Sequence, residues 1–143
     1  MQFWNKILGY RDFAKLNDIK KDLETKFGSS NPSEKYADAS ALIFFKTKTQ
    51  QTWLIATNLA LYCILDDTVI DIFHVKWGIK KNELINTSGQ IILDLKIEPN
   101  YRENSGLINF GLNHKNWLYS KKLYPDSSKL RNDIYELIKA KLG

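Results

Sequence analysis

Few of the side chains that commonly do chemistry in proteins occur in this chain, and those few are widely spaced. The sequence contains two histidines, His74 and His114, and one cysteine, Cys63. These residues are too few and too scattered for a zinc site, which takes closely spaced His, Cys or carboxylate ligands. Cys63 lies in an apolar run, where we expect a small buried hydrophobe rather than a nucleophile. We interpret His74 as a solvated or hydrogen-bonded strand residue, and His114 as a residue of a hairpin turn.

The carboxylates do not form a recognisable acid–base pair or metal site either. Asp66 and Asp67 are a conceivable metal pair, but two aspartates between apolar strands are typical of a turn. Asp71 and Asp94 lie in separate strand patterns, and their spacing does not pair them. The sequence has no glycine-rich phosphate loop and no serine-hydrolase or zinc-protease motif. We therefore predict no catalytic residues, no metal and no cofactor, although Asp71, His74 or Asp94 buried together in a cleft would reopen the question.

Lysines are the remaining candidates for a binding site. Lys46 and Lys48 flank a predicted loop, and Lys80 and Lys81 follow Trp77. If these lysines converge on one rim, they could hold an anionic headgroup or an acidic peptide. The alternative is that they keep the protein soluble and prevent aggregation through strand edges. Arginine is scarce and no aromatic–basic RNA-binding motif is present, so we expect no nucleic-acid partner.

Length and composition limit the class of protein further. The chain has 143 residues and a net charge of +5, which predicts one globular domain able to bury a core without disulfides or metal. No apolar stretch approaches the roughly 20 residues that span a bilayer. The first residues lack the apolar core of a signal peptide. We expect a cytoplasmic protein.

Two amphipathic helices are predicted, one toward each end of the chain. Apolar residues recur at three- and four-residue steps from Arg11 to Phe27, and Gly28 follows where helices commonly end. The second helix is predicted over 127–142, with Asp126 or Ser127 as its N-cap.

Between the helices the pattern changes to about seven β-strands. The predicted strands cover 41–45, 53–57, 59–65, 69–79, 91–97, 107–112 and 117–119. Strand 69–79 is expected to be half-buried, with Asp71 as the exception to its alternation and a bend near Gly78. Its apolar face is expected to hold Val69, Phe73, Val75, Trp77 and Ile79. Strand 91–97 has the cleanest alternation of apolar and polar residues. Because no helices separate these closely spaced strands, we predict antiparallel pairing.

The first helix is not needed to build a seven-stranded core, so its apolar face must cover something. It covers either its own sheet or a partner chain. A short amphipathic turn over 3–8 could dock in the same way. We treat 1–37 as an N-terminal helical extension and 38–143 as the β-structure with its C-terminal helix, within one compact domain.

Part of this pattern resembles a bacterial pleckstrin-homology-like (PH-like) domain, a family related in shape to GRAM domains. The segments that carry the resemblance are Thr52–Tyr62, the strands that follow to Leu118, and the closing helix Ser127–Leu142. In such families a strand ends in a Thr-Asn or Thr-Asp turn and the next strand follows at once, as at Thr57-Asn58. The resemblance implies a mainly β fold, a split barrel of two nearly orthogonal antiparallel sheets that the C-terminal helix closes.

The resemblance also implies a platform that binds lipids, peptides or copies of itself. We expect a non-catalytic module for protein–protein interaction or self-association, acting through exposed strand edges or the N-terminal helix. A rival function is binding of an anionic lipid or headgroup at a membrane surface through Lys46, Lys48, Lys80 and Lys81. A third is a small-ligand-binding β-barrel lined by strands such as 91–97.

Overall fold

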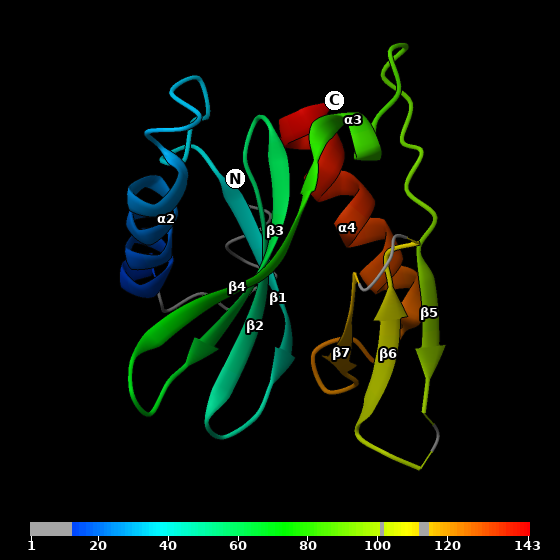
Figure 1. Cartoon of the computed structure of the whole chain (residues 1–143). Coiled ribbons are helices and arrows are strands. Elements are labelled where there is room, and N and C mark those ends of the chain that lie inside the picture. Colours follow the sequence, from blue (N-terminus) through cyan, green and yellow to red (C-terminus); the bar gives the residue numbers. More distant parts are fainter. Residues whose placement is uncertain (1–12, 101, 112–114) are drawn as a thin grey trace.

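A computed structural model describes residues 13–100, 102–111 and 115–143. It contains two antiparallel sheets, one of four strands and one of three, with a helix before and a helix after them (Figure 1). The elements are α2 (Phe13–Phe27), β1 (Ser40–Lys46), β2 (Gln50–Ala56), β3 (Ala60–Asp67), β4 (Ile72–Lys80), α3 (Lys81–Leu84), β5 (Lys96–Pro99), β6 (Ser105–Asn109), β7 (Asn116–Ser120) and α4 (Ser127–Leu142). The predicted mainly β fold with antiparallel pairing and two flanking helices is confirmed. The strands form two separate sheets rather than a closed barrel.

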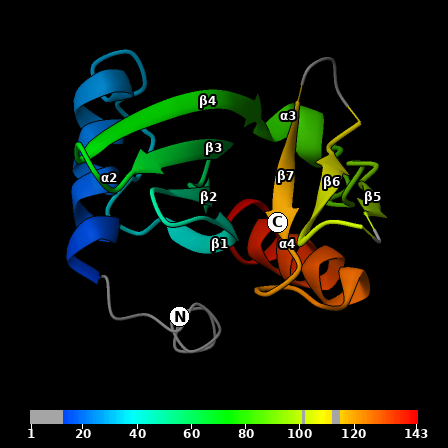
Figure 2. The same ribbon diagram turned by 90° about the horizontal axis from the view of Figure 1, so that it is seen from below.

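The four-stranded sheet β1–β4 is the central layer, and both of its faces are covered. Helix α2 lies on one face, and α4 with the three-stranded sheet lies on the other (Figures 1 and 2). Leu16, Ile19 and Leu23 of α2 share a buried cluster with Trp53 and Tyr62 of the sheet. This two-sided burial explains why β2 and β3 read as continuous apolar runs rather than alternating ones. Of the two alternatives for the N-terminal helix, the structure shows that it covers its own sheet.

The two sheets meet at one corner and separate at the other. At the β1–β7 corner, the backbone N–H of Lys46 donates to Ser120 Oγ at 2.8 Å, and this hydroxyl donates to the Lys46 carbonyl at 3.2 Å. At the opposite corner, residues 81–95 separate β4 from β5, and β4 is the last strand of its sheet. Within the described part of the chain, no strand pairs with the outer edge of β4.

Two predictions about the β3–β4 connection were wrong. Asp66 and Asp67 were expected in the turn, but both belong to β3, opposite Phe73 and Ile72. The turn instead covers 68–71, so Val69, expected in the half-buried face, lies in the turn and is 70% exposed. A buried aspartate can remain in the strand because Lys15 of α2 pairs with Asp66 at 3.2 Å.

A β-bulge at Lys76 overturns the single-face prediction for β4. Cys63 pairs with Trp77 and the next residue, Ile64, pairs with Val75, so Lys76 is an extra residue on β4. A bulge of this kind reverses which face the following side chains take. Phe73 and Val75 therefore pack toward α2, whereas Trp77 and Ile79 belong to the core under α4. The bulge lies two residues before Gly78, near which the bend was expected.

The segment 91–97 keeps its predicted alternation of burial but is only partly a strand. Leu93 and Leu95 are buried, while Ile92 and Asp94 are exposed. However, Ile91 forms one isolated bridge, 92–95 is outside any ladder, and β5 begins only at Lys96. Alternating apolar residues report which side chains are buried, and they do not specify whether the backbone finds a partner strand.

The other predicted elements lie close to their expected positions. Asp126 caps α4 by accepting from the Ser128 backbone N–H at 2.9 Å. The apolar stripe predicted for this helix is fully buried. The strand predicted over 107–112 is β6, two residues earlier at its start and three at its end. The predicted amphipathic turn over 3–8 lies outside the described residues.

Candidate functional site

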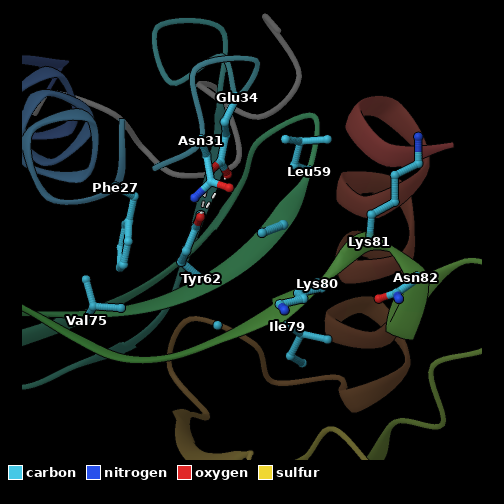
Figure 3. A pocket seen from close by; sticks show the side chains of 12 residues that line it. Phe27, Asn31, Glu34, Leu59, Tyr62, Val75, Ile79, Lys80, Lys81 and Asn82 are labelled. Atoms are coloured by element: carbon cyan, nitrogen blue, oxygen red, sulfur yellow. Dashed lines mark hydrogen bonds between the residues drawn. The ribbon is translucent and has the colours of Figure 1, made fainter. Parts of the chain in front are cut away.

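A groove of about 610 Å³ lies on the α2 side of the four-stranded sheet, next to the outer edge of β4. Its walls come from the end of α2, the loop that follows it, the start of β3, the second half of β4 and the start of α3. Figure 3 shows Phe27 and Val75 at one end, Lys81 and Asn82 at the other, and Glu34 with Tyr62 between them.

The loop after α2 is attached to the turn between β2 and β3. Asn58 Oδ1 accepts from the Lys35 backbone N–H at 2.7 Å, and Asn58 Nδ2 donates to the Ser33 carbonyl at 3.1 Å. Thr57 Oγ1 accepts from the backbone N–H groups of Leu59 and Ala60, each at 3.1 Å. The Thr57-Asn58 turn therefore both starts β3 and holds the loop that forms one groove wall.

Glu34 is the polar centre of this wall. Its side chain is buried, and its carboxyl oxygens accept from the hydroxyls of Tyr36 at 2.7 Å and Tyr62 at 2.8 Å. The Thr57 hydroxyl donates to the same group. Burial, followed by the hydrogen bond to Glu34, raises the pKa values of Tyr36 and Tyr62 above their usual range, so both phenols stay protonated donors. Glu34 thus fixes the groove wall, because three hydroxyl groups occupy its carboxyl oxygens.

The rest of the groove floor is apolar. The Phe27 and Tyr62 rings stack with centroids 5.5 Å apart and planes 16° apart. Gly78 leaves room beside that stack, since a Cβ atom there would lie 3.1 Å from the Tyr62 ring. Lys80 and Lys81 line the end nearest α3. An apolar floor with cationic side chains at one end suits an extended apolar segment that carries a carboxylate at that end.

The four predicted binding lysines do not form one site. Lys46 pairs with Gln51 at one end of the sheet, whereas Lys80 pairs with Ala60 at the other end. Lys48 lies in the connection between β1 and β2, beside Lys46. The seven-residue strands between the two ends correspond to about 20 Å. Only Lys80 and Lys81 line the groove.

The residues that would have suggested catalysis are not brought together. Asp71, His74 and Asp94 are all exposed. Cys63 is fully buried, as predicted, and burial raises the pKa of its thiol well above the usual range. Within 13–100, 102–111 and 115–143, no three His, Cys, Asp or Glu side chains are placed to hold a metal ion. His114 lies outside the described residues.

Sequence reasoning identified the Thr57-Asn58 turn and two groove lysines but missed Glu34. Glu34 lies in a polar loop, and its hydroxyl partners Thr57 and Tyr62 are 23 and 28 positions away. No local spacing indicates such a contact. The local sequence Pro32-Ser33-Glu34 is typical of an exposed loop. It therefore does not indicate that Glu34 is buried.

Comparisons of the chain with protein-family models, with curated proteins and with solved structures gave no match. None of the helices in the described residues is long and apolar enough to cross a membrane.

Proposed function

We propose that this chain is a non-catalytic, PH-like binding module that binds a protein segment in the groove between α2 and β4. The observation that carries the proposal is the position of the groove, which runs beside a strand edge without a partner among the described residues. An extended segment can bind to such an edge through backbone hydrogen bonds, while its side chains fill a neighbouring groove.

The arrangement of the strands supports the PH-like part of the proposal. The resemblance implies two antiparallel sheets that meet at one corner, separate at another and are closed by a C-terminal helix. Four strands, then three strands, then α4 occur here in that order. Ser120 joins the β1–β7 corner, and β4 and β5 do not pair. Helix α2 is additional to this PH-like arrangement, and it supplies one wall of the groove.

The residue types in the groove support a binding role rather than catalysis. Among the described residues that line it, there is no histidine, cysteine, serine or threonine. Its carboxyl group, Glu34, already accepts from three hydroxyls. The floor offers stacked rings and aliphatic side chains, which contribute affinity through buried apolar area.

Selection of peptide ligands tests the proposal. A library of random peptides displayed on phage would be selected on the full chain, and the recovered peptides measured by calorimetry against two variants. Val75→Arg fills the groove, and Leu107→Arg is a matched change on the other sheet, where Leu107 is 40% exposed. We expect Val75→Arg to weaken binding by about tenfold or more. Equal losses with both variants would contradict the groove assignment.

The rival function, binding of an anionic headgroup, has one specific observation in its favour. Lys80 and Lys81 both line the groove end, although Lys46 and Lys48 are remote from them. Sedimentation with phosphatidylserine vesicles at two salt concentrations separates the two functions. Salt-sensitive binding to the vesicles that is lost in Lys80→Glu would favour the rival function over the proposal. Binding of the selected peptides without any binding to vesicles would support the proposal.

A further inference from the structure

The β3–β4 hairpin carries an unusual surface at its tip. Turns of this kind are mostly polar, yet Val69 is 70% exposed, Ile70 is 59% exposed, and Ile72, at the start of β4, is 45% exposed. The tip is held in shape, because Asp67 Oδ1 accepts from the backbone N–H groups of Val69 at 3.0 Å and Ile70 at 3.3 Å. An ordered, exposed apolar tip indicates a contact surface.

The two ends of β4 carry opposite charges. Asp67 and Asp71 lie at the tip end, and Lys80 and Lys81 lie at the end that borders the groove. Asp71 is exposed and 3.8 Å from Lys15. On the basic side, Glu83 of α3 follows Lys81, and the buried Glu34 lines the groove. In Figure 1 the tip projects at the lower left, while the opposite end of β4 reaches α3.

We propose that the protein segment bound in the groove is the β3–β4 hairpin of a second copy of this chain, related by a twofold axis across β4. This inference rests on the proposed function and names its partner. Two β4 strands that run antiparallel bring each acidic tip against the basic end of the other copy. A single twofold contact thus forms two charge pairs and places two apolar tips beside two grooves.

The faces of β4 limit the register of this pairing. Residues directly opposite in an antiparallel pair project to the same face. Phe73 packs toward the α2 side, and Gly78 lies against Tyr62 on that same side. Setting Phe73 opposite Gly78 of the second copy sets Ile72 opposite Ile79. The turn that precedes β4 then brings Asp71 close to Lys80 and Ile70 close to Lys81. The bulge at Lys76 then lies at the axis, and the ladder forms on both sides of it.

A second copy explains these features better than an unrelated partner. The apolar tip and the apolar groove, and the acidic and basic ends, are complementary within one chain, and twofold pairing satisfies all of them together. Leu59, Lys81 and Asn82 line the groove end that the tip would contact (Figure 3).

Charge reversal tests this inference in the full chain by sedimentation equilibrium. Asp71→Lys and Lys80→Asp each create two like-charge contacts in the dimer, so each should raise its dissociation constant by about tenfold or more. The double variant restores opposite charges and should return within about threefold of the original value. Residues 71 and 80 lie at opposite ends of β4, whose nine residues span about 30 Å, so this rescue reports contact between chains. Glu136→Lys, an exposed change on α4, is the control.

Three outcomes decide the inference. Weakened single variants with a restored double variant support it. A chain that stays monomeric at about 1 mM overturns it, and so does a dimer that responds equally to all variants, including Glu136→Lys. In the monomeric case the peptide selection with Val75→Arg still tests the groove, so failure of self-association and failure of the proposed function are separate results.

Discussion

Asp66 shows how a single buried side chain depends on its surroundings. The carboxyl group is fully buried and pairs with Lys15 at 3.2 Å, while its Oδ1 atom has no hydrogen-bond partner among the described residues. Burial raises the pKa of Asp66 above its ordinary value of 3.8, and the Lys15 ammonium opposes this only in part. The folded protein therefore holds this proton more tightly than the unfolded chain does.

The consequence is a pH dependence with a definite sign. Because the folded-state pKa is raised, the stabilising contribution of Asp66 is present below pH 3.8 and is lost as pH rises through the folded-state pKa. Asp66→Asn lacks this titration. The free energy of unfolding of the native chain, minus that of the variant, should fall with rising pH, by at most about 1.4 kcal/mol per pH unit.

Urea denaturation of both proteins from about pH 3 to pH 7 measures this difference. A difference that stays constant would show that Lys15 fully offsets burial at this site, and one that rises with pH would show that Lys15 outweighs burial. Each protein is compared with the other at the same pH, so titration of the remaining carboxylates cancels to the extent that Asp66 acts independently of them.

Among the elements, α2 combines a structural role with a role at the groove. Leu23 is 1% exposed and lies in the cluster shared with the central sheet. Phe27, at the end of the helix, stacks on Tyr62 in the groove. The helix therefore covers the sheet along its length and forms part of the proposed binding site at its end.

Leu23→Ala tests whether α2 belongs to the cooperative core. The change leaves a cavity between helix and sheet and should lower the free energy of unfolding by about 2–5 kcal/mol. Asp22→Ala, the neighbouring exposed position, should change it by less than about 0.5 kcal/mol. Similar small effects of both changes in chemical denaturation would mean that α2 unfolds separately from the sheet.

The sequence predicted those features of the elements that depend on residues close together along the chain, and it missed those that depend on distant residues. The helix pattern around Leu23 depends on residues three or four positions apart, and the Asp126 cap depends on a residue two positions away. Both predictions were confirmed. The bulge at Lys76 was missed, because it depends on how β3 pairs with β4 and leaves the alternating pattern unchanged. Glu34 was missed for the same reason, since its partners are distant in the sequence.

At the scale of the whole molecule, the uneven coverage of the central sheet accounts for the site. Helix α2 and the opposite layer cover both faces of β2 and β3, but β4 keeps a free outer edge in the part of the chain that the structure describes. Such edges invite pairing with another chain unless they are blocked. The bulge at Lys76 interrupts this edge, and the residues on both sides of it remain available.

Amide hydrogen exchange along β4 tests the central claim, that this edge and its groove form the binding surface. Exchange would be followed residue by residue by NMR, over protein concentrations from below to above the dissociation constant of the proposed dimer. We predict that outward-facing amides of β4 exchange at least about tenfold more slowly when the site is occupied, while those of β2, already paired on both sides, do not change. Slower exchange at the three-stranded sheet instead, with β4 unchanged, would contradict the account.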